Sequence, residues 1–359
     1  MNVKDTVIVS ACRTPIGKLF GQFKDITARE LAIAAGKEAI KRAGVEPHVV
    51  DEIVMGEVLS GMQGSLPAMQ VGHRIGLGSH AVGVTINQNC ASGMRALEIA
   101  SDHIMVGKAT VVLVVGVESM STAPYLLDKA RSGFRMNDGT VYDSMTHDAL
   151  IDELTPGHMG ITAENVAEMY GITREECDEL AVMSHNRAVQ AIDAGNFKEE
   201  IVPIVLKSKR GDTIIDTDEH PIRGTSMESL STLKPVFKAG GVVTAANASG
   251  VNDAAAACIV MSAEKAAELG VTPLAHIVHI CSAGVEPRIM GVGPAKAIPK
   301  VLLAAGVRFQ DVECWEINEA FAAQFIGAGR MLKEEAGMEL NMADVNRNGS
   351  GISLGHPIG

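Results

Sequence analysis

The sequence predicts a layered α/β fold that carries a long insertion. Strand-like apolar runs alternate with helical segments over about the first 120 of its 359 residues, which is the pattern of layered α/β domains. From about Ser121 to Ala246 the chain is more charged, richer in methionine and less regular, which indicates an inserted segment. The apolar pattern of strands returns at Ala254–Met261 and again at Ala275–Cys281.

The first strand and helix follow from local signals. Thr6–Val9 is a β-branched run typical of a strand. Thr27 and Glu30 form a capping box, in which the hydroxyl and the carboxylate satisfy free N–H groups at a helix start. The helix should stop at Gly44, because glycine is favoured just past a helix end. Thr173–Glu176 similarly caps a helix within the insertion.

The next elements continue the alternation of strand and helix. Val49–Met55 is a strand-like run that ends at a glycine. A second strand, Val82–Ile86, turns into a helix that covers about residues 91–106. Thr110–Val115 follows as a nearly continuous β-branched run, which is typical of a strand covered on both faces.

A faint internal repeat is visible at a shift of 262 residues. Ala43–Val45 then falls on Ala305–Val307, and Glu57 falls on Glu319. Both copies combine a helix, an Ala-Gly-Val turn, a strand and a polar end. Two similar halves that face each other would bring these ends toward one site, where open α/β sheets usually bind ligands. Chance similarity between two αβ units is the alternative explanation.

Composition excludes several classes of partner. A net charge of −12 disfavours nucleic acid or an anionic membrane as a partner, and aromatic residues, at 3%, are too few for base-stacking platforms. The N-terminus lacks the layout of a signal peptide, and the longest apolar stretch, Ala109–Val117, is too short to span a membrane. Six scattered cysteines without a Cys-x-x-Cys pair favour reduced thiols in the cytoplasm over a disulfide framework.

Cys90 is the first candidate for chemistry. It lies where a strand turns into a helix, among the small residues Ala91, Ser92 and Gly93. The free N–H groups and the dipole of a helix start stabilise a thiolate, so we expect a lowered thiol pKa and a nucleophilic role. The alternative is a buried structural cysteine. The other five cysteines lack such a setting.

His356 and Asn318 are the second and third candidates. His356 lies on a glycine-rich turn, and imidazole is the natural base for a thiol at neutral pH, although a histidine in such a loop is often incidental. Asn318 follows a predicted strand, Cys314–Ile317, and its amide can hold a water or donate to a developing oxyanion. Alternatively, Asn318 and Glu319 cap the helix that follows.

Two other patterns resemble metal or nucleotide sites without meeting their requirements. His276, His279 and Cys281 look like a metal cluster, but residues three apart on a strand face opposite sides, so the histidines cannot bind one ion together. Gly291–Lys296 lacks the last glycine of a dinucleotide-binding fingerprint, and a proline follows its second glycine. We therefore expect no metal and no nicotinamide cofactor.

Several motifs together resemble the thiolase family, from the first strand to the last residue. Their order along the chain matches that of the family, which makes the resemblance specific. It is closest to the short-chain biosynthetic branch, acetyl-CoA C-acetyltransferase. The motifs lie at Ala11–Gly17, Asn89–Met94, Gly116–Pro124, Gly157–Gly160, Asn247–Asp253, Asn318–Ala322 and Gly355–Gly359.

The resemblance implies a five-layered α-β-α-β-α fold of two similar halves with an inserted loop domain. The N-terminal domain would span residues 1–270, with the insertion at about 121–246, and the C-terminal domain would span residues 271–359. The resemblance also implies a homo-oligomer, either a dimer or a tetramer.

An acyltransferase that needs no cofactor beyond its coenzyme A thioester substrates is also implied. Cys90 would take an acyl group from acetyl-CoA while His356 accepts the thiol proton, and Asn318 would hold a water that helps His356 bind the thioester oxygen. A second acetyl-CoA would lose an α-proton and attack the acyl-enzyme, giving acetoacetyl-CoA and free coenzyme A. Weaker matches place Arg223 and Ser229 near the coenzyme A. The pantetheine and acyl pocket would be lined by His158, Met159, Ser249 and Phe321.

One departure from the family bears on activity. Family members continue past the motif at Gly355–Gly359 to a Cys-x-Gly motif, whose cysteine handles the α-proton. The sequence ends at Gly359, so we expect a truncated C-terminal domain and no residue for that role. If these 359 residues are the whole protein, we expect at best slow acyl exchange with coenzyme A and negligible condensation.

Other functions fit parts of the pattern. A degradative 3-ketoacyl-CoA thiolase runs the same chemistry toward cleavage on longer chains, but His158 and Met159 favour the short-chain branch. A carrier-protein ketosynthase shares the fold, but the Asn-Glu-Ala-Phe motif that begins at Asn318 argues against it. An inactive subunit that keeps only a coenzyme A site is the last alternative.

Overall fold

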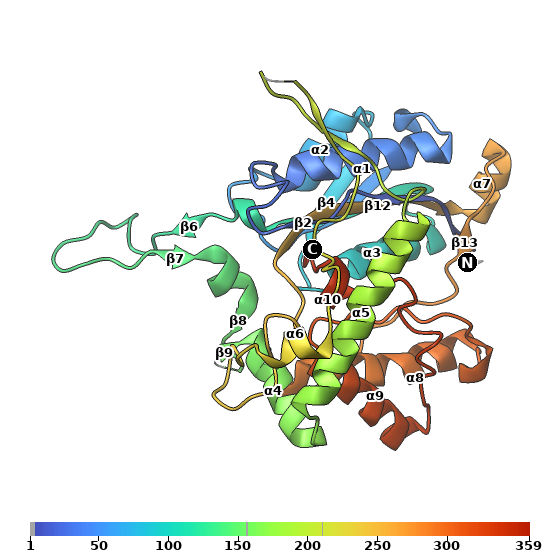
Figure 1. Cartoon of the computed structure of the whole chain (residues 1–359). Coiled ribbons are helices and arrows are strands. Elements are labelled where there is room, and N and C mark those ends of the chain that lie inside the picture. The colour runs from blue at the N-terminus through green and yellow to red at the C-terminus, as the bar shows by residue number, and fades with distance from the viewer. Residues whose placement is uncertain (1–3, 156, 210) are drawn as a thin grey trace.

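A computed structural model describes residues 4–155, 157–209 and 211–359 (Figure 1). Its centre is one mixed sheet of β1 (Thr6–Arg13), β2 (Gly17–Lys18), β3 (Glu52–Gly56), β4 (Val82–Ile86), β5 (Val111–Ser119), β12 (Asn252–Ser262) and β13 (Ala275–His276). The strand order is β13-β1-β12-β5-β3-β4, and β2 pairs with the start of β12. β3 is parallel to β4 and β5, whereas β12 is antiparallel to β1 and β5.

Helices cover both faces of this sheet. On one face, Leu31 of α1 (Ala28–Ala43) and Val71 of α2 (Pro67–Ile75) share a buried cluster with Leu113 of β5. On the other face, Ile104 of α3 (Ser92–Met105) packs with Val112 of β5. Successive residues of β5 therefore point into different cores, which confirms the prediction of a strand covered on both faces. α7 (Ala263–Leu269) follows β12 at the end of the sheet.

The predicted helix ends are confirmed. Thr27 and Glu30 form both hydrogen bonds of the capping box, and Gly44 ends α1 in the left-handed conformation with φ of 66°. The strand predicted from Val49 begins later, at Glu52, because a 3₁₀ turn with Pro47 at its first position occupies the preceding residues.

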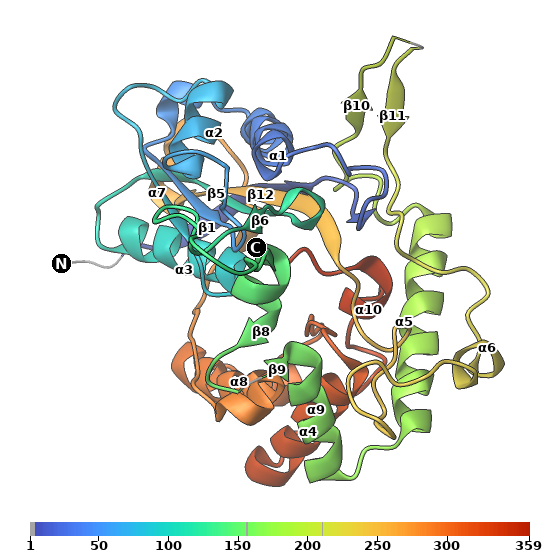
Figure 2. The ribbon, with the colours of Figure 1, turned by 90° about the vertical axis from the view of Figure 1, so that its left-hand side faces the viewer.

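The insertion consists of helices and short hairpins. Its long helix, α5, begins with a capping box at Thr173 and Glu176, as predicted, and ends at Gly195. The hairpins β6–β7 and β10–β11 project from the body (Figures 1 and 2). The elements are β6 (Tyr125–Leu126), β7 (Tyr142–Asp143), β8 (Ile151–Asp152), β9 (Gly157–His158), α4 (Met159–Tyr170), α5 (Arg174–Ala194), β10 (Ile204–Leu206), β11 (Thr213–Ile215) and α6 (Met227–Ser231), with a π-helical turn at Thr146–Leu150 and a 3₁₀ turn at Met120–Thr122.

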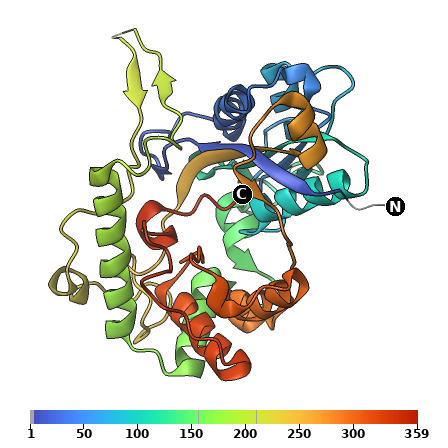
Figure 3. The same ribbon diagram turned by 90° about the vertical axis from the view of Figure 1, so that its right-hand side faces the viewer.

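The second half contributes α8 (Gly293–Ala305), α9 (Ala322–Ala336) and α10 (Gly351–Leu354), with a 3₁₀ turn at Pro287–Val292 before α8. These helices bury a second core together with α4 and α5, and α8 and α9 lie beside each other (Figure 3). α8 ends at Gly306 in the left-handed conformation and a 3₁₀ turn at Phe309–Asp311 follows, just as Gly44 and a 3₁₀ turn follow α1. The repeat noted in the sequence is therefore also a repeat of local structure.

Two predicted strands in the second half are shorter than expected. Of Ala275–Cys281, only β13 pairs with β1, because β1 begins at Thr6 and offers no partner beyond it. Cys314–Ile317 is extended but carries a single bridge, between Trp315 and Val345, within the part of the chain that the structure describes. The domain boundary near residue 270 stays a prediction. Among the described helices, none combines the length and the hydropathy that crossing a membrane requires.

Candidate active site

Cys90 lies on a tight turn between β4 and α3. Asn89 has a φ of 46°, a left-handed conformation that asparagine tolerates better than most residues, and its N–H donates to Asn87 Oδ1 at 2.8 Å. Ser92 Oγ accepts the N–H of Gln88 at 2.9 Å and donates to the Asn89 carbonyl at 2.6 Å. These bonds set the sharp change from strand to helix and leave the Cys90 side chain exposed.

The lowered pKa predicted for Cys90 is wrong. The N–H groups of the next two residues donate to carbonyl oxygens within the turn, so only the N–H of Cys90 itself reaches the sulfur. Although the side chain is accessible, protein atoms crowd around the sulfur, and this desolvation together with the charge of Glu118 raises the pKa of the thiol to about 11. The resting nucleophile is therefore a neutral thiol.

His356 lies just after α10 on a turn that requires glycine. Gly355 has a φ of 103°, and a Cβ on it would lie 2.6 Å from atoms of the Asn252 side chain. The backbone N–H of His356 donates to Asn252 Oδ1 at 2.9 Å. The ring is half-buried, and its desolvation lowers the pKa of His356 to about 4. The imidazole is therefore neutral and free to accept a proton at physiological pH.

Asn318 lies beside His356. Its Nδ2 is 3.4 Å from both ring nitrogens of His356, at the outer limit of a hydrogen bond. Gly351 gives it room, since a Cβ there would lie 2.5 Å from Asn318 Oδ1. The alternative role as a helix cap is wrong, because α9 begins at Ala322 with Phe321 at its N-cap position.

Close glycine contacts bring the His356 turn to the Cys90 turn. The carbonyl oxygen of Gly359 would lie 2.8 Å from a Cβ at Gly56 and 3.4 Å from one at Gly93, the second residue of α3. Gly116 in β5 makes a similar close approach, with a distance of 3.2 Å. The segment that follows His356 thus lies on the start of α3, immediately behind Cys90. No hydrogen bond links the two side chains among the described residues.

An aromatic stack lines the part of the insertion predicted to hold the acyl group. The rings of His158 and Phe237 stack with centroids 4.6 Å apart, and Phe237 meets Phe321 edge-on at 6.1 Å. Desolvation lowers the pKa of His158, so it stays neutral at pH 7. Met159 follows at the first position of α4 and packs against the second core. His158, Met159 and Phe321 therefore lie in one apolar region.

Ser249 is held next to Phe321 by backbone pairing. The N–H of Ser249 donates to the Ala320 carbonyl at 2.8 Å, and the N–H of Ala322 donates to the Asn247 carbonyl at 2.8 Å. This short pairing fastens the motif that begins at Asn247 to the motif that begins at Asn318.

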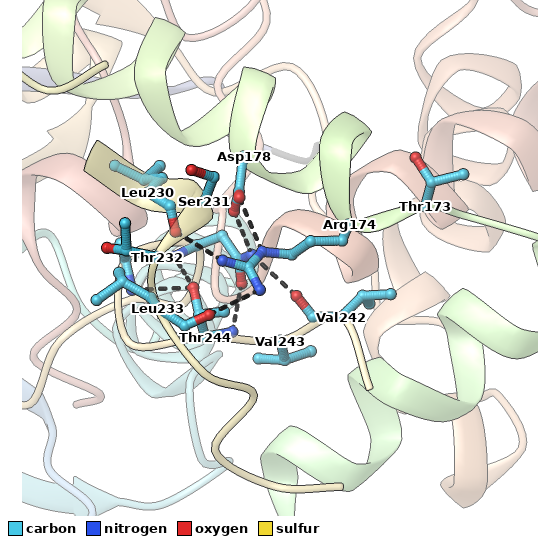
Figure 4. Close-up of polar contacts among 12 residues, drawn as sticks. Thr173, Arg174, Asp178, Leu230, Ser231, Thr232, Leu233, Val242, Val243 and Thr244 are labelled. Atoms are coloured by element: carbon cyan, nitrogen blue, oxygen red, sulfur yellow. Dashed lines mark hydrogen bonds and ion pairs between the residues drawn. The ribbon is translucent and has the colours of Figure 1, made fainter. Parts of the chain in front are cut away.

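A buried polar network fixes that pairing to α5 (Figure 4). Asp178 accepts from Asn247 Nδ2 at 2.9 Å and from Arg174 Nε at 2.8 Å. The remaining guanidinium nitrogens of Arg174 donate to the carbonyls of Leu230 and Leu233 at 2.7 and 3.0 Å, which holds the α6 segment against α5.

Arg223 and Ser229 lie on the surface and contact none of the other site residues among those described. Arg223 forms a bidentate ion pair with Asp193, in which its two terminal nitrogens donate to the two carboxylate oxygens at 2.7 and 2.9 Å. Both side chains are exposed. Ser229 completes a capping box with Ser226 at the start of α6. The structure therefore places Asn318 beside His356 and the end of the His356 turn on the helix start that follows Cys90, and it leaves these two predicted coenzyme A contacts on the surface.

Two buried carboxyl groups lie behind the junction of the two turns. Glu118 accepts from the N–H groups of Val58 and Leu59 at 3.0 and 3.1 Å and from that of Gly359, yet burial raises its pKa to about 7. Glu57 is fully buried, and neither carboxyl oxygen has a hydrogen-bond partner among the described residues. Burial and the charge of Glu118 raise the pKa of Glu57 to about 8.

Replacing Glu57 with glutamine should stabilise the protein at alkaline pH. Between the ordinary pKa of 4.5 and about 8, native Glu57 keeps a proton that the unfolded chain has lost, so stability falls as pH rises through this window. The full pKa shift corresponds to a loss of about 5 kcal/mol in the free energy of unfolding. The glutamine has no proton to lose, but its buried amide also lacks partners, so the variant should recover about 2 kcal/mol of this loss. Urea unfolding at pH 8.5 should show this gain and at pH 4.5 almost none. An equal gain at both pH values would contradict it.

The sequence analysis did not identify several residues of this site. Asn252 and Glu118 lie inside motifs that the sequence singles out, but their buried contacts depend on segments far away in the chain. Phe237 lies in an irregular stretch without a motif, and only its stacking on His158 reveals it.

Comparison with known proteins assigns the chain to a family. The sequence matches the family descriptions "Thiolase, N-terminal domain" over residues 6–264 and "Thiolase, C-terminal domain" over residues 271–359. The acetyl-CoA acetyltransferase of Syntrophomonas wolfei is 47% identical over 358 residues, which cover 99% of this chain and 89% of that protein. The acetyl-CoA acetyltransferase of Escherichia coli strain K12 is 44% identical, with the same coverage.

Solved structures agree with this assignment. An acetyl-CoA acetyltransferase from Syntrophomonas wolfei superposes with a TM-score of 0.98 at 56% identity, covering 99% of this chain and 90% of that one. Human mitochondrial 3-ketoacyl-CoA thiolase superposes with a TM-score of 0.94 at 39% identity, covering 100% of this chain and 89% of that one. These neighbours confirm the predicted fold class, and the chain belongs to the thiolase family.

Proposed function

We propose that the protein is an acyltransferase that joins two molecules of acetyl-CoA, reversibly, into acetoacetyl-CoA and coenzyme A. The observation that carries the proposal is the placement of a neutral imidazole, His356, on a turn packed against the helix start behind the Cys90 thiol. The similarity to the acetyl-CoA acetyltransferases of Syntrophomonas wolfei and Escherichia coli supports this choice of substrate.

The first half-reaction transfers an acyl group to Cys90. The thiol has a high pKa and His356 a low one, so the resting pair is neutral and the proton moves to the imidazole only as the sulfur attacks the thioester carbonyl. The bond between the carbonyl carbon and the coenzyme A sulfur then breaks, and the leaving thiolate takes the proton from His356. The products are an acyl-cysteine and free coenzyme A.

Condensation follows in the second half-reaction. A second acetyl-CoA loses an α-proton, and its carbanion attacks the acyl-cysteine carbonyl to form the new carbon–carbon bond. The bond to the Cys90 sulfur breaks, and the thiolate takes up one proton in place of the one that the α-carbon gave up, so the step releases no net proton. The thioester group helps because it acidifies the α-carbon and supplies a good leaving group. We assign Cys90, His356 and Asn318 to the first half-reaction and no residue to removal of the α-proton.

The apolar region around the aromatic stack suits the pantetheine arm and a short acyl group. His158, Met159 and Phe321 would line it, with Ser249 beside Phe321. Arg223 would bind a coenzyme A phosphate, because a phosphate can replace the exposed Asp193 as its partner, and Ser229 would lie near the same end. The chemistry requires no metal and no cofactor.

A chain-length series tests the proposal against its alternatives. Acetoacetyl-CoA should be cleaved faster than longer 3-ketoacyl-CoA substrates, and acetyl-CoA should leave an acyl group on Cys90 that mass spectrometry detects. Identity to the acetyl-CoA acetyltransferases of known structure, at 43% and 56%, exceeds the 39% to the human 3-ketoacyl-CoA thiolase. A preference for long chains would make the protein degradative, and no acyl-enzyme would make it a binding subunit.

Asn318→Ala should lower turnover by about 100-fold with little change in KM, because a donor that acts on the developing oxyanion contributes mainly in the transition state. The measurement is steady-state cleavage of acetoacetyl-CoA by coenzyme A. A large rise in KM with unchanged turnover would assign Asn318 to substrate binding instead.

We also propose a homo-oligomer, a dimer or a tetramer, in the cytoplasm. β4 is the edge of the sheet, and Val82 on it is 60% exposed, as is Met94 at 59% on the adjacent α3, so this edge can pair with a second copy. The projecting β6–β7 hairpin exposes Tyr125 and Met136, which a further contact would cover. All six cysteines are free, which fits a reducing compartment. Light scattering would give the number of subunits, and a monomer would reject the oligomer.

A further inference from the structure

The turn that carries His356 is fastened at its two ends by buried polar side chains. At one end, Asn252 Oδ1 accepts the N–H of His356 at 2.9 Å. At the other end, the Glu118 carboxylate accepts the N–H of Gly359. Both side chains belong to residues with no exposed surface. Between these points Pro357 has no N–H, and the N–H of Ile358 has no hydrogen-bond partner among the described residues.

Asn252 is itself held rigidly. It is the first residue of β12, and its Nδ2 donates to the Gly17 carbonyl at 2.9 Å and lies 3.3 Å from His220 Nδ1. Gly355 packs directly on it, with no room for a Cβ. The amide can therefore not rotate without losing its contacts to β2 and to His220, and it presents Oδ1 to His356 in one orientation.

Glu118 is held in the same way at the far end of the turn. It lies in β5, paired with Ala254 of β12, and its carboxylate binds the N–H groups of Val58 and Leu59 as well as that of Gly359. Ile358 packs beside Val58 and Leu59 in a small apolar cluster. The carboxylate thus joins the end of the His356 turn to the loop after β3 and to the centre of the sheet.

We propose that Asn252 and Glu118 are positioning residues that together clamp the turn and hold the His356 imidazole toward the Cys90 thiol. The effect of the clamp on catalysis rests on the proposed function, whereas its effect on the rigidity of the turn does not. Among the described residues, the single backbone–backbone hydrogen bond of residues 355–359 runs from the N–H of Gly355 to the Gly351 carbonyl, so the clamp explains how this short turn can present a base in a defined place. Catalysis by a general base needs such positioning, because misplacement by about 1 Å can cost 100-fold in rate.

Two measurements separate the clamp from the proposed function. Hydrogen exchange of the peptide that covers residues 351–359 reports how firmly the turn is held and requires no activity. The rate at which acetyl-CoA acylates Cys90 requires the base, whereas alkylation of Cys90 by iodoacetamide at pH 9 does not. Asn252→Ala should speed exchange in the turn and slow acylation by at least ~10-fold, while alkylation stays within two-fold of wild type.

Conservative variants distinguish positioning from general damage. Asn252→Asp keeps an oxygen that accepts from His356, so exchange and acylation should lie closer to wild type than in Asn252→Ala. Glu118→Gln should slow acylation but speed alkylation, because removal of the negative charge near Cys90 favours its thiolate. Glu164→Gln is the matched control: Glu164 is a buried carboxyl that accepts two backbone N–H groups, from Val242 and Val243, away from this turn.

The outcomes are distinct. Unchanged exchange in the turn of folded Asn252→Ala and Glu118→Gln, or wild-type acylation in both, overturns the clamp. An equal slowing of acylation in Glu164→Gln overturns it too, because the effect would then follow from lost stability. If Asn252→Ala does not fold, the comparison of Asn252→Asp and Glu118→Gln with wild type decides. Absence of acylation in the wild-type chain rejects the proposed function alone, and exchange still tests the clamp.

Discussion

Cys90→Ser should abolish the acyl-enzyme and lower acetoacetyl-CoA cleavage by at least ~10⁴-fold. The desolvated site already keeps the thiol neutral, with a pKa of about 11, and a hydroxyl there holds its proton far more tightly. His356, with a pKa of about 4, is too weak a base to activate a hydroxyl, whereas sulfur is nucleophilic enough to react as its proton leaves. Intact-protein mass spectrometry after mixing with acetyl-CoA would show the loss.

Cys314→Ser is the matched control, because Cys314 is the other exposed cysteine. It lies in the extended segment before Asn318, so a general effect of oxidation or of losing an exposed thiol would appear in both variants. Cleavage by Cys314→Ser should equal that of the wild type. An acyl group that persists in Cys90→Ser, or that maps to Cys314, would remove Cys90 from the mechanism.

Local signals sufficed for the elements around the site. The hydroxyl and carboxylate of Thr27 and Glu30 act within one helical turn, so the start of α1 could be predicted without knowing its neighbours. The change from β4 to α3 was predictable for the same reason, because a strand-like run meets small residues around Cys90. The alternation of strands and helices indicated a layered α/β fold, but the five-layered thiolase fold needed more, since it rested on the order of motifs along the chain.

Properties that depend on distant residues could not be predicted. The helix start after Cys90 suggested a stabilised thiolate, but the nearby N–H groups are already bonded within the turn and Glu118 adds a negative charge. Asn252 lies about 100 residues from His356 in sequence, so its hydrogen bond has no local signature. The strand expected at Cys314–Ile317 does not form, for a related reason. A strand requires a neighbouring segment that pairs with it over several residues, and this segment has a single bridge among the described residues.

His356→Ala should lower the rate of Cys90 acylation by at least ~100-fold, the usual contribution of a positioned general base. Without the imidazole the neighbouring amides of Asn318 and Asn252 cannot take the thiol proton, and the Glu118 carboxylate is already engaged by three backbone N–H groups at the far end of the turn. Rapid-quench mass spectrometry of the acyl-enzyme measures the rate directly. His48→Ala is the control, since His48 is exposed in the 3₁₀ turn after α1. An undiminished rate in His356→Ala would make the turn a purely structural element.

The pH dependence of acylation tests the same assignment more sharply. An ordinary histidine is protonated below about pH 6.5 and stops acting as a base there, whereas the lowered pKa keeps His356 neutral down to about pH 5. Glu118 titrates near pH 7 beside the turn, so the profile should be measured in Glu118→Gln as well as in the wild type. In Glu118→Gln the rate should stay level from pH 7.5 to pH 5. A fall centred at pH 6.5 in both proteins would mean that the reacting imidazole is solvated, and that the desolvated turn is not the state that accepts the proton.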